Sequence, residues 1–398
     1  MDVREKRNFI AVLTIAVSFF VIMQFVSVFL AARIFMLTGE DFVAIGLYLI
    51  VVASGTFLSF FLSSMFCKRF KPIYMTQIMT VFACAFLVVL LLFQDHLENY
   101  FLLFGFAWGM VQGLYTGSTS IMISTLFKAK GTRGFIVWRK ISRGASQIVF
   151  PVTIGLLIDL GDFSLSIIAV LAVSVILVVA TFFIKYPEFK GKMLQPKKYF
   201  QFMKEKGAVK QSKEFWFVAL TSAPFYKMTI MSTTLIVIAF GSNIGLGGLK
   251  SVAPIIMMSL LFMYHKSSPK SKTRIYWVAA ILPPIVAVSL FFGINMVTVS
   301  LFFFIKAINQ IISMEEMSTR LNATKYWGGE EFIIESNLFF EIPKFIGSII
   351  SSVMIMMIGI IGVYPWVIAT IAIIMLSIYL VHSVLLFRWK NKYAQSKN

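Results

Sequence analysis

Long apolar stretches separated by short polar segments run through the whole chain. A helix needs about 20 residues to cross the hydrocarbon core of a bilayer, and twelve stretches can reach that far. We expect spans at Phe9–Met36, Phe42–Phe66, Ile73–Phe93, Tyr100–Phe127, Phe135–Leu160, Ser164–Ile184, Phe215–Phe240, Ile244–Met263, Ile275–Phe292, Met296–Met317, Phe332–Ile361 and Val363–Phe387. The pattern therefore predicts an all-α membrane protein with twelve transmembrane helices.

The loops between these stretches indicate the orientation of the chain. If the N-terminus lies inside, every second loop is cytoplasmic and should collect Lys and Arg. The loops at residues 68–71, 128–133 and 266–274 do so, whereas the loops on the opposite side contain neither residue type. We therefore expect both termini to be cytoplasmic, in a multi-pass protein of the plasma membrane or bacterial inner membrane.

A basic segment divides the chain into halves. Residues 185–214 form a cytoplasmic linker rich in lysine between a six-helix bundle at residues 1–184 and a second at residues 215–398, which ends in a short basic tail. Within the linker, residues 199–209 form either an amphipathic helix on anionic lipids of the inner leaflet or a solvated connection.

The composition excludes several classes of function. The chain is 59% hydrophobic and only 13% charged, against about 25% charged in soluble domains. Its formal net charge of +19 lies mostly in short loops, so we expect no nucleic-acid partner. Cys67 and Cys84 form no CxxC or Cys/His set, which indicates no disulfide framework, metal site or cofactor. The three histidines lie far apart without an acidic cluster, so we expect no enzyme and no catalytic residues.

Charged residues deep in the predicted spans are the main candidates for a site. Such groups are costly in a bilayer unless they face a partner or a water-filled cavity. At about 1.5 Å per residue, Lys227, Lys306, Glu341 and Lys344 lie about 14–18 Å deep, and Arg143 about 12 Å deep. If all five are ionised, their net charge is positive, which favours an anionic or zwitterionic solute. Two alternatives stay open: desolvation can neutralise a lysine, and Arg143 or the Glu341–Lys344 pair can be structural.

Other polar residues complete the candidate set. Gln24, Gln112 and Tyr115 are further candidates for binding the solute. A buried carboxylate such as Glu341 can carry a proton, or it can merely neutralise Lys344 three residues away. Pro343 between them leaves the carbonyl of Phe339 without its helical hydrogen bond, a feature suited to a gating helix. Glu335, in the same span, is either part of this coupling and gating set or interfacial.

Glycines recur every four residues along the fourth predicted span. They form a flat strip that lets another helix approach closely. The packing is either static or allows sliding, and the strip consists of Gly105, Gly109, Gly113 and Gly117.

Taken together, these features resemble the major facilitator superfamily. The shared features are two six-helix halves, a basic central loop, the absence of Lys, Arg, Asp and Glu from the third, sixth, ninth and twelfth spans, and the Gly/Pro pattern GASQIVFPVTIG at residues 144–155. The segment SMFCKRFKPI at residues 64–73 matches the family's loop signature only at Arg69. The resemblance implies a divergent member whose seventh and tenth helices line a cavity.

We accordingly expect a secondary transporter that moves a small solute by alternating access, with proton coupling through Glu341, and that works as a monomer. The alternatives are a multidrug efflux pump and a non-transporting membrane sensor or assembly protein. Efflux pumps for cationic drugs usually need an embedded acid in the first half, and no such acid is visible.

Overall fold

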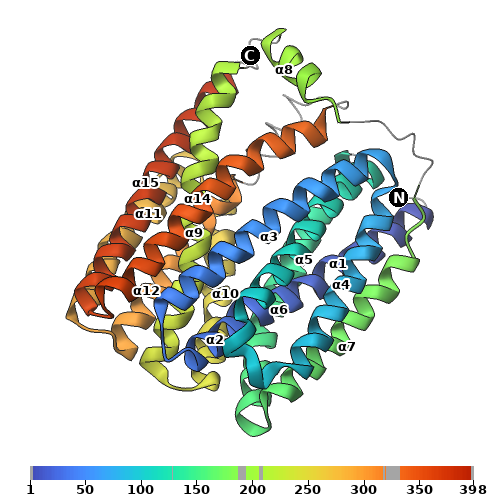
Figure 1. The fold of residues 1–398 in the computed structure, drawn as a ribbon. Helices are drawn as coiled ribbons and strands as arrows, with labels where there is room; N and C mark the ends of the chain where they lie inside the picture. The colour runs from blue at the N-terminus through green and yellow to red at the C-terminus, as the bar shows by residue number, and fades with distance from the viewer. Residues whose placement is uncertain are drawn as a thin grey trace. The chain divides into compact units, whose positions relative to one another are not determined.

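The structure is a computed structural model that describes residues 3–127, 129–186, 194–205, 209–316, 319 and 332–395. All regular elements in these residues are helices (Figure 1). The first half contains α1 (Val3–Gln24), the π-helical η1 (Phe25–Leu30), α2 (Ala31–Leu37), α3 (Phe42–Arg69), α4 (Pro72–Leu92), η2 (Gln94–His96), α5 (Leu97–Leu126), α6 (Ala129–Leu160) and α7 (Phe163–Phe182). The remainder contains α8 (Pro196–Glu205), α9 (Val209–Phe240), α10 (Asn243–Lys266), α11 (Pro269–Ala287), η3 (Val288–Phe292), α12 (Met296–Ile308), α14 (Ile333–Ile361) and α15 (Pro365–Gln395).

Eleven helices within the described residues are long and apolar enough to span a membrane, so the chain is a multi-pass membrane protein. They correspond to all the predicted spans except the fourth. The fourth is α5, whose 30 residues are ample for a crossing but include glycines and hydroxyl residues that lower its hydropathy. The count of twelve therefore stays a prediction.

Local chemistry explains where several helices begin and end. The ninth span starts at Pro269 rather than Ile275, because the side chain of Ser268 accepts the N–H of Ser271 and proline suits the first helical turn. The seventh and eighth spans are separate helices: α9 ends at Phe240, and Gly241 adopts a φ of 63° before α10 begins.

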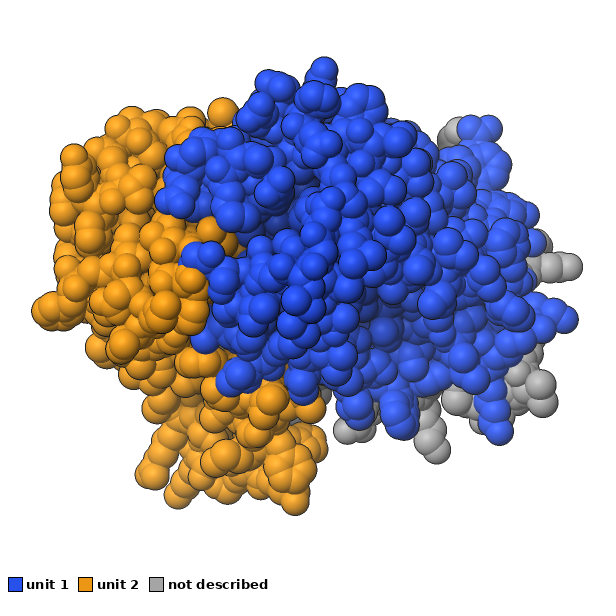
Figure 2. Space-filling model, turned by 90° about the horizontal axis from the view of Figure 1, so that it is seen from below, with its two compact units in different colours: residues 1–40, 51–194, 241–252 blue, residues 41–50, 195–240, 253–398 orange. Residues whose placement is uncertain are grey.

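The chain forms two compact units, which Figure 2 shows in different colours. Unit 1 comprises residues 1–40, 51–194 and 241–252, and unit 2 comprises residues 41–50, 195–240 and 253–398. Two helices are shared: α3 begins in unit 2 and ends in unit 1, whereas α10 begins in unit 1 and ends in unit 2.

Each unit is a helical bundle. In unit 1, α7 packs against α1 and α4, and in unit 2, α9 packs against α14 and α15. The helices α4, α7 and α11 expose many large apolar side chains, among them Phe82, Ile176 and Ile281. Side chains of this kind suit contact with lipid.

Candidate functional site

In unit 1, aromatic and polar side chains meet around α1, α5 and α6. The rings of Phe19 and Tyr115 stack with centroids 3.7 Å apart. The exposed Arg143 on α6 places its guanidinium carbon 4.1 Å from the centroid of the Phe20 ring. Two of the expected binding residues, Arg143 and Tyr115, thus contact neighbouring residues of α1.

Two amides on α1 and α5 add polarity to unit 1. Gln112 accepts a hydrogen bond from the hydroxyl of Thr56 at 3.4 Å. Gln24 is the last residue of α1, directly before the π-helical turn η1. Its buried Oε1 has no hydrogen-bond partner among the described residues. Single π-helical turns are frequent at functional sites.

In unit 2, Lys227 is buried on α9. Its side chain is 8% exposed, and its ammonium donates to the carbonyl oxygen of Leu49 on α3 at 3.1 Å. No carboxylate in the described part of the chain forms an ion pair with it. The partner of the Lys227 amine is therefore a neutral backbone carbonyl.

A second basic residue of unit 2 lies on α14. The ammonium of Lys344 is 4.0 Å from a carboxylate oxygen of Glu341 and 5.3 Å from the centroid of the Tyr226 ring. One third of the Lys344 side chain is exposed, so the pair is only partly buried. Glu335, six residues before Glu341 on the same helix, is buried and accepts the backbone N–H of Gln195 at 3.0 Å.

Two further expected residues, Pro343 and Lys306, lie on α14 and α12. Pro343 lies inside α14, and the carbonyl of Phe339 that it leaves without a helical partner accepts the indole N–H of Trp216 at 3.0 Å. Lys306 lies in α12, but its side chain falls outside the part of the structure that is described. The candidate residues therefore divide between the units: Gln24, Gln112, Tyr115 and Arg143 lie in unit 1, and Lys227, Glu335, Glu341, Pro343 and Lys344 lie in unit 2.

The glycines of α5 lie against α3. A Cβ added to Gly109 or Gly113 would fall well inside van der Waals contact with backbone oxygens of Val52 or Thr56. A Cβ on Gly117 would meet Ser63 Oγ at 2.7 Å. Gly105, one turn earlier, is also buried. The two backbones thus approach closely over about two turns, both within unit 1.

Sequence reasoning missed the roles of four charged or titratable groups. Lys250 on α10 is buried to 8% exposure, and Arg33 on α2 lies 5.8 Å from the centroid of the Phe163 ring. Glu316 and His382 form a buried pair with 3.6 Å between carboxylate and imidazole. For Lys250 and Arg33, the available signal was a charged residue inside an apolar stretch. Glu316 and His382 are far apart in the sequence, so no local pattern reveals that they pair.

The short connection before α7 carries a carboxylate with an altered pKa. Asp162 is the N-cap of α7 and accepts both the hydroxyl and the backbone N–H of Ser164. These hydrogen bonds, the hydroxyl's first, hold the pKa of Asp162 below its ordinary value, and the charge of Arg33 acts in the same direction. Within the described residues, no three His, Cys, Asp or Glu side chains come together as a metal site.

No family model and no curated protein matches the chain. Solved structures do match it over nearly its whole length. A nucleoside transporter, NupG, has a TM-score of 0.66 at 14% identity, covering 96% of this chain and 99% of that one. An auto-inhibited POT family peptide transporter has a TM-score of 0.70 at 10% identity, with 98% and 97% covered. A bacterial homologue of the iron transporter ferroportin has a TM-score of 0.65 at 11% identity, with 98% and 99% covered.

These likenesses establish the fold. The chain has the fold of secondary transporters of the major facilitator type, and the resemblance predicted from the sequence is confirmed at that level. The solutes in the names of these structures differ, from nucleosides to peptides and iron. At such low identity none of these solutes transfers to this chain.

Proposed function

We propose that this chain, with the fold of a membrane transporter, moves a small anionic or zwitterionic solute by alternating access. The observation that carries the proposal is the placement of Lys227, a buried ammonium whose partner is a backbone carbonyl. Burying an unpaired ammonium costs several kcal/mol, so a fold that keeps one usually has a use for it.

The carbonyl of Leu49 is a replaceable partner. An ammonium attracts a carboxylate more strongly than a carbonyl, because the carboxylate carries a net charge and the carbonyl does not. An acid group on a solute would therefore compete well for Lys227. Releasing Leu49 would free α3 from α9, because this hydrogen bond joins the two helices. Solute binding would in this way be linked to a change in helix packing.

Arg143 and Lys344 extend the same preference. The guanidinium of Arg143 lies over an aromatic ring and is exposed, so it can bind a carboxylate or phosphate with two parallel hydrogen bonds. The positive charge of Lys344 is partly balanced by Glu341, whose carboxylate oxygen lies 4.0 Å from the ammonium. We assign Gln24, Gln112 and Tyr115 to recognition of the uncharged parts of the solute. Glu335, Glu341 and Pro343 are assigned to gating.

The orientation and lipid contacts belong to the same proposal. The basic loops favour cytoplasmic termini. We further propose that the protein is a monomer in a plasma membrane or bacterial inner membrane. Tyr199 and Met203 on α8 are buried, whereas Lys197, Lys198 and Lys204 are exposed. The apolar face of α8 packs on the protein itself, and the exposed lysines support contact with anionic lipid headgroups of the inner leaflet. Labelling single cysteines placed near residues 5 and 391 from either side of the membrane tests the orientation.

Transport by purified protein tests the function. A thermal-shift screen against anionic, zwitterionic and cationic metabolites selects solutes, and uptake into proteoliposomes then measures flux. We expect anionic or zwitterionic hits, with flux reduced at least tenfold in Lys227→Met. Lys266→Met is the matched control, because Lys266 is exposed beside Phe262 and should tolerate the change. Wild-type flux in Lys227→Met, or hits restricted to cations, would overturn the anionic site.

A further inference from the structure

Glu316 and His382 form a buried acid–base pair in unit 2. Glu316 ends the membrane span Met296–Glu316, and His382 lies on α15. His382 is 0% exposed and Glu316 is 7% exposed. The imidazole Nε2 lies 3.6 Å from the carboxylate Oε2, and neither atom has a hydrogen-bond partner among the described residues. Two polar atoms buried so completely need a partner that satisfies both.

The opposite edge of the imidazole determines what that partner is. Nδ1 lies 2.9 Å from the carbonyl oxygen of Val218. A carbonyl only accepts, so Nδ1 must carry a hydrogen and donate it. In a neutral imidazole Nε2 is then a bare acceptor, and it faces the carboxylate oxygen of Glu316, which is also an acceptor when ionised. That arrangement is repulsive unless one more proton resides on the pair.

A water molecule cannot replace this proton. Water that donated to both atoms would hold them about 4.5 Å apart, given hydrogen bonds of about 2.9 Å. The observed 3.6 Å is too short for that bridge. The proton therefore sits on Nε2, giving an imidazolium–carboxylate pair, or on Glu316, giving a neutral acid beside a neutral imidazole. Both forms carry a net charge of zero, and loss of the proton leaves a charge of −1.

The surrounding titratable groups are engaged with other partners. Glu315 accepts the hydroxyl of Tyr264 at 2.8 Å and pairs with Lys390 at 2.6 Å. The hydroxyl of Tyr276 donates to the carbonyl of Ser383 at 2.7 Å. These contacts leave Glu316 as the acid that faces His382 in this part of unit 2.

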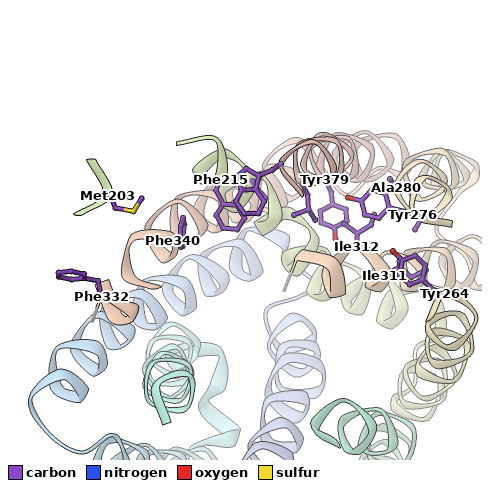
Figure 3. Close-up of a cluster of buried hydrophobic side chains, with 14 of the residues drawn as sticks. Met203, Phe215, Tyr264, Tyr276, Ala280, Ile311, Ile312, Phe332, Phe340 and Tyr379 are labelled. Atoms are coloured by element: carbon purple, nitrogen blue, oxygen red, sulfur yellow. The ribbon is translucent and has the colours of Figure 1, made fainter. Parts of the chain in front are cut away.

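The helices packed around the pair bring few other charges. The ring of Tyr379 stacks on His382 with centroids 5.0 Å apart, and the cluster of buried side chains in Figure 3 places Tyr379 near Tyr276 and Ile312. From α9, Tyr226 lies within electrostatic reach of Tyr379. Among the charged groups of α14, Glu341 and Lys344 pair with each other, and Glu335 accepts the backbone N–H of Gln195. The neighbours are thus mainly tyrosines, which stay neutral at physiological pH.

We propose that Glu316 and His382 form a proton-binding site and that this site, rather than Glu341, couples proton movement to transport. The coupling rests on the transport function proposed above, but the binding of the proton does not. When the span ending at Glu316 separates from α15, the shared proton leaves to water, and the pair remains as a carboxylate and a neutral imidazole. When the helices close again, the pair takes up one proton. A solute with one negative charge that moves with this proton carries no net charge across the membrane.

The protonation state can be measured without any solute. The chain has three histidines, so His96→Gln/His265→Gln leaves His382 as the single reporter. In lipid nanodiscs at pH 7, ¹⁵N NMR of labelled histidine should show either protons on both ring nitrogens or a single proton on Nδ1. In the second case, infrared difference spectra should contain a protonated carboxyl band that Glu316→Gln removes. A neutral ring without such a band would overturn the proton site.

Coupling is tested in proteoliposomes that contain a pH-sensitive dye, with a solute selected by the thermal-shift screen. In Glu316→Gln the amide N–H can donate to Nε2 and imitate the protonated pair. This variant should keep solute exchange within twofold and lose proton flux at least tenfold, while Glu315→Gln keeps both. If Glu316→Gln does not fold, His382→Gln serves the same test. Proton-coupled uptake at the wild-type level in these variants would overturn coupling, whereas absence of any flux in the wild type would overturn the transport function and leave the NMR result standing.

Discussion

Trp216 on α9 donates its indole N–H to the carbonyl oxygen of Phe339 on α14 across 3.0 Å. The acceptor lies four residues before Pro343, whose ring nitrogen has no hydrogen to offer it. A break in the hydrogen bonding of one helix is thereby repaired by a side chain from another. The contact also fixes the position of α14 against α9.

This repair predicts a measurable coupling between two positions. Trp216→Phe keeps an aromatic ring but leaves the carbonyl unsatisfied, which should destabilise the protein by about 1–3 kcal/mol. In a Pro343→Ala background the helix supplies its own N–H, so the same substitution should cost much less. Thermal unfolding of the four proteins in one detergent measures this double-mutant cycle.

Trp366, an exposed residue at the start of α15, gives a matched control, because Trp366→Phe removes an indole that forms no hydrogen bond among the described contacts. Equal losses of stability for Trp216→Phe in both backgrounds would show that the indole does not compensate for the proline.

The crossing of α3 and α5 predicts a strong dependence on side-chain size. Gly113→Ala should lower stability by about 1–3 kcal/mol, because the new methyl group would overlap Ser59 and the backbone of Thr56. Gly248→Ala in α10 is the control: nothing lies within 4 Å of its added Cβ, so it should raise stability by up to about 1 kcal/mol. Unfolding temperatures of the two variants in the same detergent test the contrast, and a neutral Gly113→Ala would contradict the close approach.

The N-cap of α7 predicts a dependence of stability on pH. Hydrogen bonds from Ser164 hold the pKa of Asp162 below its ordinary value, which is about 3.9. Its ionised form therefore stabilises the folded protein above about pH 4, and this contribution disappears as the pH falls through the lowered pKa. Asp162→Ala should unfold at a lower temperature than the wild type near pH 6, and the gap should close towards pH 3.

Asp162→Asn distinguishes capping from charge, because asparagine still accepts a hydrogen bond but does not titrate in this range. Its difference from the wild type should be smaller than that of Asp162→Ala at pH 6. If the gap for Asp162→Ala stays constant over the whole pH range, the ionised carboxylate does not provide the stabilisation.

The sequence predicted the fold to the extent that lipid dictates it. A bilayer requires long apolar helices, and basic loops collect on its cytoplasmic side. The spans, and candidate buried charges such as Lys227, can therefore be predicted directly from the sequence. The sequence also predicted α5 as a span, although Gly109, Gly113 and Gly117 lower its hydropathy; these glycines pack against another helix. Hydropathy indicates how well a helix suits contact with lipid, and it carries no information on contacts between helices.

Partnerships between distant residues could not be predicted. The sequence shows that Pro343 frees a carbonyl, but only the packing of α9 against α14 identifies Trp216 as its donor. Glu316 reads as an interfacial acid in the last turn of a span, and His382 reads as a lone histidine near the end of another. Their meeting depends on the tertiary arrangement of the bundle, and it is this meeting that gives them a shared proton.

The π-helical turn η1 has a consequence for the part of the first span that follows it. A turn of this kind accommodates about one residue more than an α-helical turn, and each residue of an α-helix rotates the chain by about 100°. The side chains of α2 are therefore out of phase with those of α1. Arg33 lies over Phe163 and acts on Asp162 in this phase. If the same residues formed a regular α-helix instead, the extra residue would swing Arg33 about a quarter turn away from these neighbours, whereas deleting one residue between 25 and 30 would leave Arg33 close to its present direction.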